Sequence, residues 1–446
     1  MKTFEKDLIR SIFFLALPAI LEMALHTMLG VADTIMISRL INTEALSGSG
    51  YANQIVFMII FIFSSFNIGA IAMISRAYGE KNHQRVNLVA NQNTLLNIIL
   101  GIIIATLSYL SHVFIFSIFD ITEAVLRYAV DYYVIITWGL PFMFVSFALS
   151  GNLRGIGDTK TPMLVVAFSN ILNIILNYVL ITGVWIFPEM GIKGAALATS
   201  ISRLLGAGAF IVILTTSREL LRLHLKAMKL TREIFRRLIS LSLPGAIEQL
   251  FMQTSFVAVG IIISKLTTLE EAAFRILLSI ESISFMPAVG ISIAAATLVG
   301  QALGEKNIPK ALNTSYIASI MALIWGLFIG GTLILFPGPI LLLFTPEIPL
   351  IEISIGAMIA AGINQPFLNP SIVLTGALRG AGDTQTVLKL VTLRLWIFFV
   401  PLTYLFVMIF NLGIKSMWIA ETLSFVLFIP ILLNRIKGLE WTKIQA

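Results

Sequence analysis

The chain has 446 residues, of which 58% are hydrophobic and only 12% are charged. Soluble domains carry about 25% charged residues, so this composition excludes a water-soluble globule and a disordered chain. The net charge of +7 does not indicate a nucleic-acid binder, because the basic residues are not clustered on a polar scaffold. The long, continuous apolar runs predict an all-α polytopic membrane protein rather than a β-barrel, whose strands alternate.

Twelve apolar segments are long enough to cross a membrane, which takes about 20 residues. In chain order they cover approximately residues 11–37, 45–75, 88–116, 123–152, 161–183, 191–216, 238–262, 272–300, 309–337, 348–377, 386–410 and 414–434. We interpret the first as a retained span rather than a signal peptide. Glu22 and Asp33 interrupt it, and a near copy recurs in mid-chain.

Most of the lysines and arginines lie at the two termini and in the loops that follow even-numbered spans. This bias predicts a multi-pass protein of the inner or plasma membrane with both termini in the cytoplasm. The richest stretch is 217–237, which we interpret as a cytoplasmic linker along anionic lipid headgroups rather than a nucleic-acid patch.

Three motifs occur twice, at a constant separation of 225 or 226 residues. They are Leu-Pro-(two residues)-(Leu/Ile)-Glu at 17–22 and 243–248, Gly-Glu-Lys-Asn at 79–82 and 304–307, and Leu-Arg-Gly-x-Gly-Asp-Thr at 153–159 and 378–384. Six spans per copy predict a parallel repeat: two pseudo-symmetric six-helix lobes around a central cavity, the architecture of an alternating-access transporter. We expect an N-lobe (1–216), the linker (217–237) and a C-lobe (238–446). Because one chain holds both lobes, we expect a monomer.

The two glycine-rich motifs lack the spacing and the lysine of a phosphate-binding loop. We interpret them as tight cytoplasmic turns, with Thr161 and Thr386 capping the next helices and Pro162 as a first helical residue. Without an ATP-hydrolysing module, transport must draw on an ion gradient. Without cysteines, and with four scattered histidines, the chain predicts no disulfide, no catalytic metal site and no enzyme.

Taken together, the motifs resemble those of the multidrug and toxic compound extrusion (MATE) family, in its bacterial and archaeal type. The resemblance covers the whole chain and includes Pro18, Glu22 and the Asp33-Thr-Ile-Met-Ile sequence of the first span. It implies an exporter of small amphipathic, often cationic compounds, with H⁺ or Na⁺ as coupling ion and no other cofactor. The alternative is a flippase for lipid-linked or polysaccharide precursors from the same wider group. A membrane enzyme or a channel has less support.

The resemblance also implies a coupling-ion site in the first half. The family's acidic, amide and hydroxyl ligands correspond to Asp33 in the first span, Asn173 and Asn177 in the fifth, and Thr199 in the sixth. A sodium-coupled branch has a glutamate in the seventh span where this chain has Gln253, so we do not expect a C-lobe site of that type.

Asp33 is a candidate on physical grounds as well. A carboxylate inside a membrane span costs about 2.5–3.5 kcal/mol, and its repeat equivalent, Val259, shows that the fold does not require an acid there. Asn173 and Asn177 are four residues apart and so share one helix face. They either contribute oxygens to an H⁺ or Na⁺ site at Asp33 or form hydrogen bonds between helices.

The other intramembrane polar residues fall into two groups. Glu22 and Glu248 each follow a proline, Pro18 and Pro244, by four residues, so we expect them to bond backbone groups freed by a helix kink. The candidates for the cavity wall and the attraction of cationic substrate are Gln54, Gln253, Glu281 and Glu421, with Arg203 and Arg394 as possible partners of acids.

Overall fold

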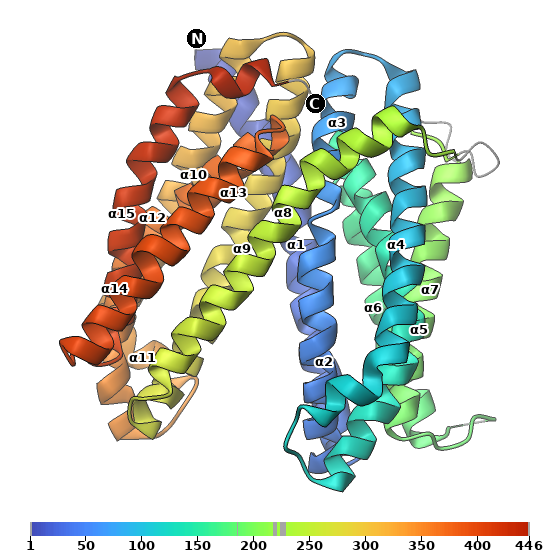
Figure 1. The fold of residues 1–446 in the computed structure, drawn as a ribbon, viewed down its shortest axis with the longest axis vertical. Coiled ribbons are helices and arrows are strands. Elements are labelled where there is room, and N and C mark those ends of the chain that lie inside the picture. The colour runs from blue at the N-terminus through green and yellow to red at the C-terminus, as the bar shows by residue number, and fades with distance from the viewer. Residues whose placement is uncertain (1, 185, 217–220, 224–228, 445–446) are drawn as a thin grey trace. The chain divides into compact units, whose positions relative to one another are not determined.

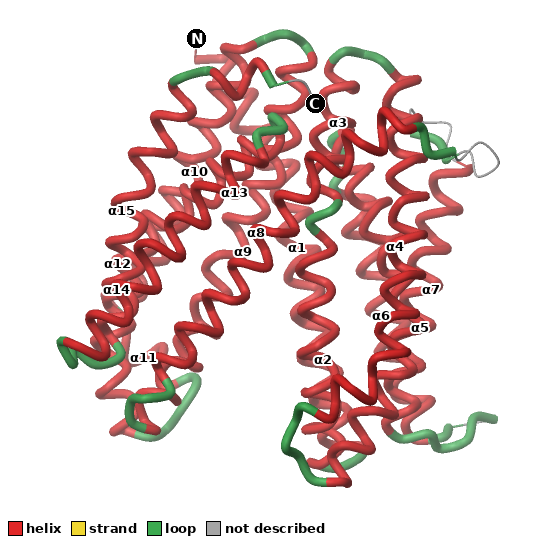
Figure 2. Tube along the Cα trace, viewed as in Figure 1, coloured by secondary structure: helices red, strands yellow, loops and turns green. Residues whose placement is uncertain are grey.

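The structure is a computed structural model that describes residues 2–184, 186–216, 221–223 and 229–444. Within these ranges it contains twelve helical segments long and apolar enough to span a membrane, and no strand (Figures 1 and 2). The predicted all-α class and the twelve spans are therefore confirmed. Most helices extend a few residues beyond the predicted apolar runs.

The first half comprises α1 (Lys2–Leu40), α2 (Thr43–Ser64), α3 (Asn67–Gly79), α4 (His83–Ser117), α5 (Glu123–Ile156), α6 (Lys160–Thr182) and α7 (Ile192–Thr216). The second comprises α8 (Arg232–Ile263), α9 (Thr268–Gly304), α10 (Ile308–Leu335), α11 (Pro337–Leu342), α12 (Ile348–Gly380), α13 (Thr384–Leu393), η2 (Arg394–Phe399), α14 (Val400–Tyr404), η3 (Leu405–Ile409), α15 (Lys415–Lys437) and η4 (Glu440–Lys443). The segments η2 and η3 are π-helical and interrupt the eleventh span.

The Gly-Glu-Lys-Asn motif makes the same turn in both halves. Its lysines, Lys81 and Lys306, both have a positive φ of 58°. Its asparagines then cap the next helix, since Asn82 and Asn307 each accept a hydrogen bond from the backbone N–H three residues later, at 3.0 Å. The motif is therefore a structural device that ends one helix and starts another.

The Leu-Arg-Gly-x-Gly-Asp-Thr motif forms the predicted tight turn, with Gly157 (φ 92°) and Gly382 (φ 89°) in the left-handed region. The predicted threonine caps are wrong. Asp158 caps α6 by accepting from the backbone N–H groups of residues 160 and 161, because α6 begins at Lys160 and places Thr161 and Pro162 inside the helix. Likewise α13 begins at Thr384, so Thr386 is a helical residue.

The chain divides into two compact units, which we describe separately. One contains Met1–Ile20, Ile71–Glu80 and Ser240–Ala446, and the other contains Leu21–Ala70 and Lys81–Ile239. These differ from the predicted lobes in residues 1–20, 71–80 and 238–239. The lobe boundaries stay a prediction, and residues 217–220 and 224–228 of the predicted linker lie outside the described residues.

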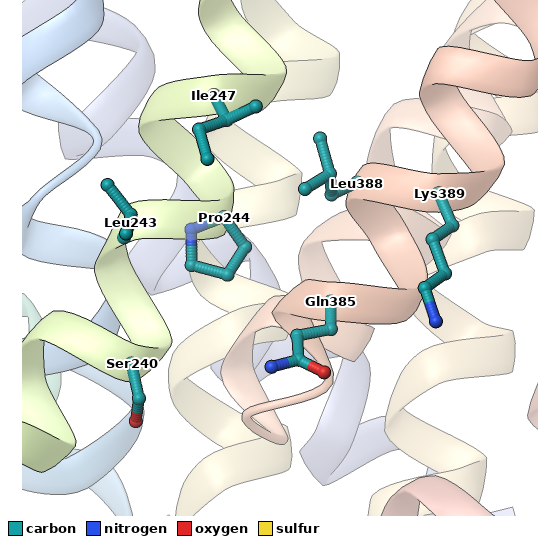
Figure 3. Close-up of a pocket in the computed structure, with 7 residues that line it drawn as sticks. All are labelled: Ser240, Leu243, Pro244, Ile247, Gln385, Leu388 and Lys389. Atoms are coloured by element: carbon teal, nitrogen blue, oxygen red, sulfur yellow. The ribbon is translucent and has the colours of Figure 1, made fainter.

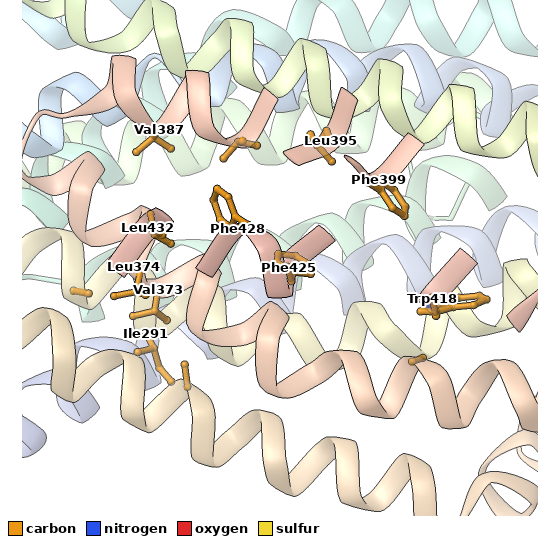
Figure 4. Close-up of a cluster of buried hydrophobic side chains, with 14 of the residues drawn as sticks. Ile291, Val373, Leu374, Val387, Leu395, Phe399, Trp418, Phe425, Phe428 and Leu432 are labelled. Atoms are coloured by element: carbon orange, nitrogen blue, oxygen red, sulfur yellow. The ribbon is translucent and has the colours of Figure 1, made fainter. Parts of the chain in front are cut away.

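In the first of these units α12 packs against α9, α10 and α15. Its core gathers large buried side chains from α15 against η2, α12 and α9, as Figure 4 shows for Trp418, Phe425, Phe428 and Phe399. In the other unit α5 packs against α2, α4 and α7, with Tyr132, Tyr133 and Phe144 in its core.

The ends of α3 and α9 pack against each other within the first unit with repeat symmetry. A Cβ atom added to Gly79 would lie 2.0 Å from the carbonyl oxygen of Gln301, and one added to Gly304 would lie 2.0 Å from that of Arg76. Gly304 is the repeat equivalent of Gly79, and Gln301 that of Arg76. Only glycine permits this reciprocal backbone contact.

We therefore expect Gly79→Ala and Gly304→Ala each to destabilise the protein by about 1–3 kcal/mol, through overpacking against a backbone that cannot yield. Thermal unfolding of the purified variants measures the effect. Gly331→Ala in α10 is the matched control, because nothing lies within 4 Å of its added Cβ atom. An equal loss of stability in all three variants would contradict the close contact.

Candidate functional site

Helices α1, α6 and α7 bring the four predicted coupling-ion residues together within one compact unit. The Asn177 side-chain N–H donates to Asp33 Oδ1 at 2.6 Å and to Asn173 Oδ1 at 2.9 Å. The Asn173 side-chain N–H in turn donates to Thr199 Oγ1 at 3.1 Å. These contacts form a hydrogen-bonded chain from Asp33 to Thr199, which we call the Asp33 network.

Because Asn173, Asn177 and Thr199 of the Asp33 network are buried, any hydrogen-bonding group among them that lacks a partner costs free energy. Asn173 is 0% and Asn177 1% exposed, yet Asn177 Oδ1 has no hydrogen-bond partner among the described residues. A buried polar atom without a partner costs about 1–3 kcal/mol. An unpaired amide oxygen beside a carboxylate is the kind of ligand that a proton or a small hard cation would satisfy.

Two other polar side chains lie near Asp33. Arg203, one turn beyond Thr199 on α7, interacts electrostatically with Asp33 and with the buried Tyr132 of α5. Among the described residues, however, Asp33 forms no ion pair within 4 Å. The carboxylate is therefore influenced by a basic neighbour without being locked to it.

The second half contains its own buried polar group on α9, α12 and α15. Glu281 accepts hydrogen bonds from the side chains of Gln365 and Trp418, both at 3.2 Å, and Glu421 accepts one from Asn364 at 2.9 Å. The predicted cavity-wall glutamates are thus held by bonds between helices. We did not single out Asn364, Gln365 or Trp418, although two adjacent amides in an apolar span are a usable signal.

Arg394 lies at the start of the π-helical segment η2 and is buried. Its guanidinium carbon is 4.0 Å from the centre of the Phe425 ring and its side chain donates to Ser424 Oγ at 3.2 Å. It also interacts electrostatically with Glu421, but among the described residues the two form no ion pair within 4 Å, so the pairing of Arg394 with an intramembrane acid stays a prediction.

Among the described residues, the remaining cavity candidates have no comparable hydrogen-bond partners. Gln54 is exposed on α2, and Gln253 is half-buried on α8. Their predicted contact with substrate stays a prediction.

We expected the two glutamates that follow Pro18 and Pro244 to bond freed backbone groups, but within the described part of the chain they form buried ion pairs instead. Glu22 pairs with Arg154 at 2.8 Å, and Glu248 pairs with Arg379. The arginines are repeat equivalents and belong to the Leu-Arg-Gly-x-Gly-Asp-Thr motif. The reason is tertiary: in each half the fold brings two of the repeated motifs together, so the acid of one motif meets the base of the other.

Twelve apolar helices in two repeated halves, with a carboxylate network inside one of the halves, define a polytopic membrane transporter. The comparison with known proteins identifies the family. The MatE family model matches the chain twice, over residues 18–179 and 244–405, and so confirms the internal repeat. The chain belongs to the MatE family, and as a MATE-family efflux transporter it is not an enzyme.

Similar proteins align along almost the whole chain. The probable multidrug resistance protein NorM of Thermotoga maritima is 33% identical over 416 residues, which cover 93% of this chain and 88% of the relative. The multidrug resistance protein MdtK of Photorhabdus laumondii is 25% identical over 457 residues, covering 98% and 96%.

Solved structures agree with the fold. A MOP superfamily transporter from Pyrococcus furiosus, whose pocket is described as having reverse polarity, matches with a TM-score of 0.88 at 23% identity, covering 97% of both chains. An outward-facing multidrug resistance MATE family transporter matches with a TM-score of 0.87 at 23% identity, again over 97% of both chains. At this identity the likeness establishes the fold alone.

Proposed function

We propose that the transporter exports small amphipathic cations in exchange for H⁺ or Na⁺ that binds at Asp33. The multidrug resistance names of the NorM and MdtK relatives support the substrate class. The observation that carries the coupling is the bond between the Asp33 carboxylate and Asn177, whose own buried oxygen lacks a described partner. One carboxylate with neutral amide and hydroxyl oxygens suits either ion, so both remain in the proposal.

Cation loading would change the hydrogen bonds of the Asp33 network. In the structure the Asn177 amide donates an N–H to Asp33. A proton or Na⁺ on the carboxylate would oppose that donor, and rotation of the amide would instead present its unpaired oxygen. Because Asp33, Asn177 and Thr199 lie on α1, α6 and α7, loading would alter the contact between α1 and the other two helices.

Pro18 gives α1 a place to bend in response. It lies in the same helix, and the fifteen residues to Asp33 span about 22 Å at the α-helical rise of 1.5 Å per residue. In our proposal the bend exposes the substrate site alternately to the two sides of the membrane, and inward movement of the ion drives outward movement of the substrate.

The flippase alternative has less support. A pocket for anionic lipid-linked precursors would present arginines, whereas Arg203 and Arg394, which we assign to span interiors, interact with Asp33 and with Glu421. For the remaining properties we propose a location in the inner or plasma membrane, cytoplasmic termini and a monomeric state.

The test is transport in proteoliposomes with Na⁺ and H⁺ gradients imposed separately, with a fluorescent amphipathic cation as substrate. We expect at least one gradient to drive accumulation above the equilibrium level set by a gradient-free control. Substrate that merely equilibrates under both gradients would indicate passive movement and would contradict the proposal.

A further inference from the structure

A groove in the second half shares no residue with the Asp33 network. It is lined by residues of two helices, α8 and α13, and encloses about 300 Å³ (Figure 3). The lining residues are Ser240, Leu243, Pro244, Ile247, Gln385, Leu388 and Lys389. All seven belong to one compact unit.

The lining is polar at one end and apolar at the other. Figure 3 shows the Ser240 hydroxyl, the Gln385 amide and the Lys389 amine toward one end, with Ile247 and Leu388 toward the other. Gln385 and Lys389 lie in the first turns of a membrane span, at the end that the positive-inside rule assigns to the cytoplasm. A lysine there can extend its amine to the level of the lipid phosphates while its stem stays on apolar surface.

The charge of Lys389 has no counterpart in the described part of the protein. Its side chain is exposed and forms no ion pair with a described residue. Positive charge also argues against a transported organic cation as the occupant, because the two would repel each other. An anionic headgroup attached to an apolar chain matches both ends of the groove.

The internal repeat shows that the fold does not require polar residues at positions 240 and 389. The repeat equivalents of Ser240 and Lys389 are Phe14 and Leu164, both exposed and apolar. The kink proline, by contrast, is present in both halves as Pro18 and Pro244. Ser240 and Lys389 are therefore polar only in the second half, where they line the groove beside Pro244 of α8, whereas the equivalent of Gln385 is the polar Lys160.

We infer that this groove binds one anionic phospholipid. The phosphate lies against Lys389, Gln385 and Ser240, and the upper part of an acyl chain lies along Leu243, Ile247 and Leu388. A lipid bound there restricts bending of α8 at Pro244. The inference is independent of which ion drives transport and of the role of Asp33.

Native mass spectrometry of the purified full-length protein, titrated with phosphatidylglycerol or phosphatidylcholine, tests it. We expect one phosphatidylglycerol to be retained in preference to phosphatidylcholine. Lys389→Gln should weaken that binding about fivefold, the effect of one basic contact near an anionic headgroup. Lys160→Gln is the matched control, since Lys160 is an exposed lysine at the corresponding end of α6 and the repeat equivalent of Gln385. Its binding should equal that of the wild type.

A second variant, Leu388→Trp, keeps the lysine but fills the apolar end, and it should weaken phosphatidylglycerol binding to a similar extent. Unchanged binding in this variant would indicate that the lipid is held only by electrostatic attraction to the surface, and would contradict binding in the groove. Equal effects of Lys389→Gln and Lys160→Gln, equal retention of both lipids, or displacement of the lipid by millimolar inorganic phosphate would also overturn the inference.

Discussion

Replacing Asp33 with asparagine is expected to abolish ion-driven export while leaving the protein folded. Asparagine has nearly the same shape, and its Oδ1 atom can still accept the hydrogen bond that Asn177 donates to Asp33 at 2.6 Å. It has no charge to exchange for a cation, however. The variant therefore removes the ion-binding step and preserves the contact between α1 and α6.

The size of the effect follows from the driving force. A tenfold gradient of the coupling ion releases about 1.4 kcal/mol per ion, and because one-for-one exchange with a monovalent organic cation moves no net charge, this gradient sustains a substrate concentration ratio of about ten. Without coupling that ratio falls to one. The measurement is substrate accumulation in proteoliposomes under the gradient that drives the wild type, with thermal unfolding as the check on folding.

Asp131→Asn is the matched control for the same chemical change. Asp131 lies in the same compact unit, on α5, and its partner is Lys193 at 3.4 Å rather than a member of the Asp33 network. We expect wild-type transport from it. Unimpaired gradient-driven accumulation by a well-folded Asp33→Asn variant would remove Asp33 from the mechanism.

Breaking a duplicated glutamate–arginine pair should have the largest effect on stability. Arg379→Met leaves the Glu248 side chain, which is 2% exposed, as a buried charge without its partner. Removing one member of a buried ion pair costs about 3–5 kcal/mol. Arg154→Met should behave in the same way in the first half, where the Glu22 side chain is 4% exposed.

The double variant Glu248→Met/Arg379→Met separates the cost of the unpaired charge from the value of the pair. Since replacement of both members by apolar side chains is often close to neutral, we expect it to recover most of the stability lost by Arg379→Met. Lys310→Met is the control: it removes the half-buried partner of the exposed Glu305, and pairs open to solvent contribute about 0–1 kcal/mol. Thermal unfolding in detergent compares these variants with the wild type: Arg379→Met, the double variant and Lys310→Met. A double variant no more stable than the single one would contradict the buried-charge explanation.

Hydropathy, charge bias and repetition were enough to predict the twelve spans and the duplicated architecture, since each depends on features that are local in the chain. A run of apolar residues must be helical inside a membrane, whatever its neighbours. The glycine turn at residue 157 was predictable for the same reason. The cap of α6 was not, because Asp158 and Thr161 both suit that position and only the start of the helix distinguishes them.

The candidate ion site could be predicted only in part from the sequence. The intramembrane position of Asp33 and the shared face of Asn173 and Asn177 could be read directly, whereas Thr199 came from the family resemblance. The structure then placed all four in one hydrogen-bonded chain. Their role in coupling stays a prediction.

Contacts between residues far apart in the sequence could be identified only from the tertiary structure. Nothing in the local sequence pairs Glu22 with Arg154, joins Glu281 to Trp418 or stacks Arg394 on Phe425. Hydropathy fixes that a helix lies in the membrane but not how it is rotated about its axis or which neighbour it meets. Those two variables decide which polar side chains face each other, and they are settled by the packing of whole helices.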